Sequence, residues 1–165
     1  MIDWSVLDPV ARRVRVNHAL EHATITILSG RVTGVVLRGR SNRRGFYVLG
    51  DVDPDDVDSA ARDALARLRG GESELAIHPF CGTNVAVAGI FAGLSAAVVT
   101  RAGKRGGGYP GAVLAALIAL LVSQPVGIWA QRHLTTQSDV RNLQIVGVEE
   151  KEFLGRKLHF VHTSQ

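Results

Sequence analysis

Residues 17–24 read Asn-His-Ala-Leu-Glu-His-Ala-Thr, and the interpretation of the chain starts from them. They lie within residues 10–28, whose apolar side chains recur at helical spacing, so we expect a helix that packs on a core. His18 and His22 are four residues apart on that helix and share a face, where they can hold one divalent metal ion. Burying such polar groups is costly without a partner, which favours a metal over a solvated face.

The same stretch contains H-x-x-E-H, the inverted form of the zinc-hydrolase helix motif. Glu21 follows His18 by three residues, where a carboxylate can accept a proton from a water on the metal. Catalytic zinc usually has three protein ligands and one open position. We expect Cys81, the only cysteine, as the third ligand beside His18 and His22, with His78 as its competitor. Two nitrogens and one sulfur suit Zn²⁺, with Fe²⁺ as the other choice.

Charge is distributed unevenly along the chain. Residues 1–83 carry 11 basic and 11 acidic side chains, residues 84–130 carry three basic and no acidic ones, and residues 131–165 carry five and four. No basic helix or aromatic stacking platform accompanies the net charge of +4, so we expect no nucleic-acid partner. A single cysteine excludes an intramolecular disulfide.

Two stretches of the chain have no charged residue, 17 residues at 84–100 and 23 residues at 109–131. A helix needs about 20 apolar residues to cross a bilayer. We therefore expect a two-helix transmembrane hairpin over residues 84–131, joined by a loop at 101–110. A buried hairpin in a soluble core is the alternative, although a domain of this size rarely hides two such helices.

We expect a multi-pass protein of the cell membrane with its metal domain in the cytoplasm, because no signal peptide precedes that domain. The basic residues of the hairpin loop then lie outside, against the usual charge rule. A translocated domain and a hairpin that does not fully cross are the alternatives. Gly89 and Gly93 have the spacing that lets membrane helices approach closely, which favours a homo-oligomer, most simply a dimer.

The remaining segments predict an α+β class, an antiparallel sheet with helices on one face that is interrupted by the transmembrane hairpin. A helix is expected from Pro54 to about residue 68. Strands are expected at residues 31–40, 46–52, 74–78, 143–148 and 157–161, the last two around a turn at 149–155. The predicted domains are a metal-binding domain at 1–83, the hairpin at 84–131 and a C-terminal β-hairpin at 132–165 that packs on the first domain.

Three motifs in this order resemble the S-ribosylhomocysteine lyase family. Residues 18–22 resemble its H-x-L-E-H helix, residues 42–47 (Asn-Arg-Arg-Gly-Phe-Tyr) its C-R-T-G-F-Y segment, and residues 81–83 (Cys-Gly-Thr) its C-G-T segment. The resemblance implies the metal ligands and the base already named, and a site at a dimer interface. It also implies the fold of the pitrilysin-type and mitochondrial processing peptidases, which use H-x-x-E-H as well.

The chain departs from both enzyme types. Asn42 stands where the lyase has a cysteine that acts as a second acid or base, so we do not expect the lyase reaction. The distant glutamate ligand of the pitrilysin peptidases would fall in the apolar segment, which contains no acid. The match covers about residues 8–84. As a whole the chain is also similar to an uncharacterised bacterial membrane-protein family with an N-H-A-L-E-H-A-T motif.

Cys81 lies three residues before the apolar stretch that starts at Asn84, so a metal on its thiolate would lie at the membrane surface. This placement favours a membrane-anchored metallopeptidase of the inverzincin (H-x-x-E-H) type, which acts on a membrane protein or peptide, with Glu21 activating water. The alternatives are a small-molecule lyase or hydrolase and a non-catalytic, metal-stabilised subunit of a membrane complex.

The basic turn near the second motif supplies candidates for substrate binding. We expect Arg43 and Arg44, together with His78, to contact the substrate, since a guanidinium pairs well with a carboxylate or a lipid phosphate. A solvated hairpin tip is the alternative for the two arginines.

Overall fold

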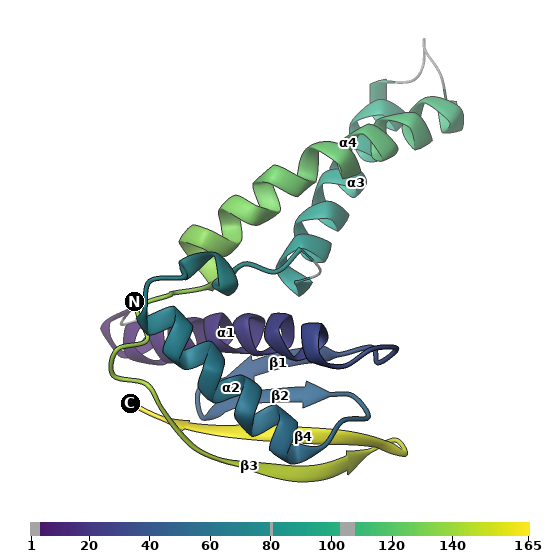
Figure 1. Ribbon diagram of the computed structural model, residues 1–165. Helices are drawn as coiled ribbons and strands as arrows, with labels where there is room; N and C mark the ends of the chain where they lie inside the picture. The colour runs from purple at the N-terminus through teal and green to yellow at the C-terminus, as the bar shows by residue number, and fades with distance from the viewer. Residues whose placement is uncertain (1–3, 80, 103–107) are drawn as a thin grey trace. The chain divides into compact units, whose positions relative to one another are not determined.

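The computed structural model describes residues 4–79, 81–102 and 108–165 (Figure 1). Its contacts divide the chain into two compact units. The first consists of Met1–His78 and Leu134–Gln165, and the second of Pro79–His133. The first unit is therefore built from two separate parts of the sequence, with the second inserted between them.

The first unit contains a four-stranded antiparallel sheet of order β1-β2-β4-β3 (Figure 1). Its strands are β1 (Arg38–Asn42), β2 (Gly45–Leu49), β3 (Gln144–Phe153) and β4 (Arg156–Ser164). Two hairpins, one from each part of the chain, pair through β2 and β4, with Phe46 opposite Val161. The segment after the inserted unit thus completes a sheet that the first segment begins.

Two helices, α1 (Trp4–Arg31) and α2 (Pro54–Arg69), pack on the sheet. Phe46, Val48 and Val161 alternate along their strands with less buried residues and are wholly buried in the core beneath the helices. Asp53 caps α2 by accepting a hydrogen bond from the Asp55 amide. The predicted α+β class with an antiparallel sheet is confirmed.

The second unit is a pair of helices, α3 (Gly82–Ala102) and α4 (Gly108–Ala130), which pack along each other. A π-helical turn, η2 (Gln131–Thr135), follows α4. Both helices are long and apolar enough to cross a membrane, and 0% of the apolar window of α3 and 22% of that of α4 are buried. The central residues of the expected loop, 103–107, lie outside the described part of the chain.

The two apolar helices approach at a polar contact rather than at the glycine pair singled out above. The Gln131 amide donates to Asn84 Oδ1 at 2.8 Å, and a Cβ added to Gly127 would collide with the same amide group. A Cβ added to Gly89 or Gly93 meets no atom within 4 Å. The glycine pair is therefore not used between α3 and α4, and the homo-oligomer stays a prediction.

Two of the predicted strands were wrong. Residues 31–40 do not form one strand, because α1 continues to Arg31 and β1 begins only at Arg38. The chain between them turns at Gly34, whose φ of 76° is easily adopted only by glycine. Residues 74–78 do not form a strand, because residues 74–76 belong to a 3₁₀ turn, η1 (Ser73–Ala76), which packs on α1 instead of adding to the sheet. The closing strands extend through most of the predicted turn at 149–155, so that only a tight turn remains.

Candidate metal centre

His18 and His22 lie one turn apart on α1, as their spacing predicts. Their ring centroids are 4.3 Å apart, and the rings meet edge to face. His22 is only 3% exposed, and His18 is half-buried. The helix therefore presents two imidazoles side by side on one partly buried face.

Each of these rings is oriented by a backbone carbonyl. His22 Nδ1 lies 2.7 Å from the Ala76 carbonyl oxygen in η1, and His18 Nδ1 lies 2.9 Å from the Thr135 carbonyl oxygen in η2. Because a carbonyl oxygen only accepts, each Nδ1 is the donor of its hydrogen bond, and in a neutral ring the lone pair that can bind a metal is then on Nε2. This arrangement is typical of metal-binding histidines, whose second nitrogen donates to a carbonyl or a carboxylate.

Cys81 directly precedes α3, and its side chain is 5% exposed. The Thr83 amide points at Sγ from 3.4 Å, which places the sulfur at the N-terminus of the helix. The partial positive charge there stabilises a thiolate, which is the form that binds metals. Cys81 follows His78 by three residues, and three residues of chain span at most about 11 Å, so the Cys81 backbone lies within that distance of the His78 backbone.

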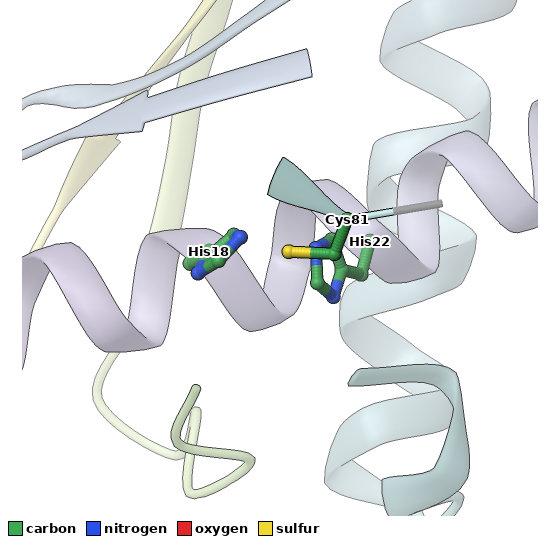
Figure 2. Close-up of side chains that lie close together, drawn as sticks. All are labelled: His18, His22 and Cys81. Atoms are coloured by element: carbon green, nitrogen blue, oxygen red, sulfur yellow. The ribbon is translucent and has the colours of Figure 1, made fainter. Parts of the chain in front are cut away.

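His18, His22 and Cys81 lie close together (Figure 2), with their ligand atoms all within 4.8 Å of one another. Zinc binds histidine nitrogen at about 2.0–2.1 Å and cysteine sulfur at about 2.3 Å, so tetrahedral ligands lie about 3.3–3.8 Å apart. The observed spread is wider by about 1 Å, which small side-chain rotations can close. Two imidazoles and one thiol therefore fit a divalent zinc or iron ion and leave a coordination position for water or substrate.

Glu21 is buried, at 4% exposure, and is not part of this ligand group. The Ser41 hydroxyl of β1 donates a hydrogen bond to Glu21 Oε2. A Cβ added to Gly39, two residues earlier on β1, would collide with the same carboxylate. The glutamate thus fits against β1 through one small residue and one hydroxyl.

Of the three residues predicted to contact substrate, His78 lies beside a residue of the ligand group, and Arg43 and Arg44 lie apart from it. The His78 ring centroid lies 5.8 Å from that of His22. Arg43 and Arg44 are exposed in the turn between β1 and β2, where Asn42 Oδ1 accepts the Arg44 amide at 2.7 Å. Their contact with a substrate stays a prediction.

Sequence reasoning missed the residues that orient the site. Gly39 and Ser41 alternate on β1, so two small residues on one strand face were a signal that a side chain lies against them. Ala76 and Thr135 act through their carbonyl oxygens, which every residue carries, so no sequence signal marked them.

Comparison with known proteins places the chain in a family. Residues 13–148 match the family described as a domain of unknown function (DUF6391). The chain belongs to the DUF6391 family. The matched segment contains the three clustered side chains and both apolar helices, and it ends within β3.

The chain is also similar to an uncharacterized protein of Picosynechococcus sp. (strain ATCC 27264 / PCC 7002 / PR-6). The two sequences are 36% identical over an alignment 169 residues long, and the alignment covers 90% of this chain and 78% of the relative. No solved structure matches the chain. For this DUF6391 protein, the geometry of the site is therefore the feature from which a function can be inferred.

Proposed function

We propose that this chain is a membrane-anchored, metal-dependent hydrolase, and in particular a peptidase that acts at the membrane surface. The observation that carries the proposal is the clustering of His18, His22 and Cys81, with both histidines oriented through Nδ1 by backbone carbonyls. Among the described residues the group contains three ligands rather than four, which favours a catalytic site over a structural one.

A bound zinc ion supplies Lewis acidity: it polarises a carbonyl oxygen and lowers the pKa of a coordinated water. In the proposal His18, His22 and Cys81 hold that ion. Glu21 is the general base that accepts the proton from the attacking water and delivers it to the leaving amine. Ser41 restricts rotation of the Glu21 carboxylate by its hydrogen bond, and the missing side chain at Gly39 leaves room for it.

The substrate class follows from the position of the thiol. Cys81 directly precedes α3, which is long and apolar enough to cross a membrane. If α3 spans the bilayer, the thiol lies at the boundary between water and lipid. Such a place suits cleavage of a membrane protein or peptide near the point where it emerges from the bilayer.

The test uses the full chain, purified in a non-ionic detergent without chelators. We expect about one zinc or iron per chain by elemental analysis. His18→Ala, His22→Ala and Cys81→Ser should each lose it, and the control His133→Ala, which removes an exposed histidine, should keep it. After cobalt substitution, a thiolate-to-metal charge-transfer band should appear in the parent protein and disappear in Cys81→Ser.

Glu21→Gln separates catalysis from metal binding. In the proposal this variant retains its metal and its unfolding temperature but loses cleavage of membrane-peptide substrates by about 100-fold or more. If His18→Ala, His22→Ala and Cys81→Ser all keep the metal content of the parent protein, the proposed metal site is overturned. Full metal content with cleavage unaffected by Glu21→Gln would overturn the catalytic role and leave a metal-stabilised module.

A further inference from the structure

A second site lies in the first unit, in a surface hollow of about 360 Å³ between the N-terminal half of α1, the β1–β2 turn and the end of β4. Its polar lining includes Arg13, Asn17, Arg43, Arg44, His162 and Thr163. The hollow is thus lined mainly by cationic and neutral hydrogen-bonding groups. None of its lining residues belongs to the metal-ligand group.

The three arginines of the hollow differ from four arginines elsewhere on the surface of this unit, which are paired with an acid. Arg31, Arg62, Arg67 and Arg141 each form an ion pair with an aspartate or glutamate. Among the described residues, Arg13, Arg43 and Arg44 form no side-chain hydrogen bond or ion pair, and no aspartate or glutamate lines the hollow. Glu149 contacts the lining residue His162 at 3.2 Å, but the Lys151 ammonium lies beside the same carboxylate oxygen. Three positive charges are therefore gathered where no aspartate or glutamate side chain lines the hollow.

The rim that carries these arginines is tied to the rest of the unit. Asn17 of α1 donates to the Asn42 carbonyl at 2.8 Å and accepts the Thr163 hydroxyl at 2.8 Å. The Arg44 carbonyl accepts the Thr163 amide at 2.9 Å. The Asn17 side chain is only 1% exposed, so this bridge between helix, turn and last strand is buried. A ligand that binds here therefore does not have to order the backbone of the turn.

We propose that this hollow binds the phosphate group of an anionic ligand. A guanidinium presents parallel N–H donors that match the oxygens of phosphate, and phosphate carries more charge to balance three arginines than a carboxylate does. Two sources share this chemistry, a soluble phosphomonoester and the headgroup of an anionic phospholipid. The proposal goes beyond the hydrolase and needs no metal.

The test measures ligand binding to the full chain in non-ionic detergent by calorimetry at low ionic strength. The probes are inorganic phosphate, glycerol phosphate and a short-chain phosphatidic acid, with acetate and a short-chain phosphatidylcholine for comparison. The test variant is Arg43→Ala/Arg44→Ala. The control is Arg62→Ala/Arg67→Ala, which removes the same net charge from exposed arginines of α2.

We expect at least one phosphate probe to bind the parent protein and the control equally. The test variant should bind it about 100-fold more weakly, since each lost bond to a charged group changes affinity by about tenfold. Arg13→Ala should weaken it by about tenfold. An unchanged unfolding temperature shows that each variant folds.

Binding of inorganic phosphate and glycerol phosphate would support the site with a soluble ligand, and binding of phosphatidic acid alone would support it with a lipid headgroup. The proposal is overturned if no phosphate probe binds the parent protein, if the test variant and control bind alike, or if acetate binds as tightly as phosphate. This test measures phosphate binding and neither metal content nor peptide cleavage. A negative result therefore refutes the phosphate site without bearing on the proposed hydrolase.

Discussion

Replacing Gly39 by alanine tests whether Glu21 lies against β1, on which its proposed role depends. The new Cβ would lie 2.6 Å from Glu21 Cδ and 2.7 Å from Cγ, so the glutamate has to move. Overpacking of this kind costs about 1–3 kcal/mol. Replacing a glycine in a strand by alanine raises the free energy of unfolding by about 0.5–1 kcal/mol. We therefore expect Gly39→Ala to lower the free energy of unfolding by roughly 1–2 kcal/mol.

Two further substitutions make this prediction specific. Gly147 also lies in the sheet, on β3, but a Cβ there meets no atom within 4 Å, so Gly147→Ala should leave stability unchanged or raise it slightly. In a Glu21→Ala background the colliding atoms are gone, and Gly39→Ala should then be neutral or stabilising. The double-mutant cycle should give a coupling of about 1–3 kcal/mol between Gly39 and Glu21.

The assay is thermal unfolding of the full chain in detergent, with the four variants of the cycle and Gly147→Ala measured side by side. A loss of roughly 1–2 kcal/mol lowers the midpoint of a chain of this length by about 2–8 °C. If Gly39→Ala is as stable as Gly147→Ala, and if its effect on the unfolding midpoint is the same in the Glu21→Ala background, the Glu21 carboxylate does not lie against β1. The positioning of the base by Ser41 and Gly39 would then be refuted.

Two other predictions concern stability. Burial lowers the pKa of His159 despite the nearby Glu150 carboxylate. As pH falls below about 6.5, His159 is therefore protonated more readily in the unfolded chain than in the folded one, which destabilises the folded state. The unfolding midpoint should therefore decrease from pH 7.5 to 5.5, and less so in His159→Leu; equal slopes would contradict this. In the helical hairpin, Gly127→Ala should lower the midpoint, because its Cβ would collide with Asn84. Gly93→Ala should leave the midpoint unchanged or raise it by improving helix propensity, and equal effects of the two substitutions would contradict the packing described here.

Features with a strong local signal were predictable from the sequence. The helix that carries His18 and His22 has a helical period of apolar residues, and the apolar stretches became α3 and α4 almost residue for residue. Cys81 was selected as the single soft donor near a helix start, and the structure brings it to the two histidines. In each case the residue type and its spacing carry the information.

Features set by tertiary contacts were not predictable in the same way. The valine-rich residues 31–40 have high β-propensity, yet residues 32–37 form no strand, and the chain turns at Gly34 between the end of α1 and the start of β1. Residues 74–78 look like a strand, but the sheet is completed by β4, from the far end of the sequence, and η1 packs on α1. Only the pairing of distant segments decides which short apolar run becomes a strand.

The two carbonyl acceptors link the inserted segment to the proposed metal site. The chain leaves the first unit after His78 and returns to it at Leu134. Ala76 lies just before the exit and Thr135 just after the return, and each supplies its carbonyl oxygen to one of the two histidines of the proposed metal site. The segments that connect to the apolar hairpin are therefore the same segments that orient His18 and His22. A substitution that displaces either connection should alter metal affinity even though it removes no ligand, because a histidine that loses the partner of its Nδ1 proton loses its orientation and part of its basicity.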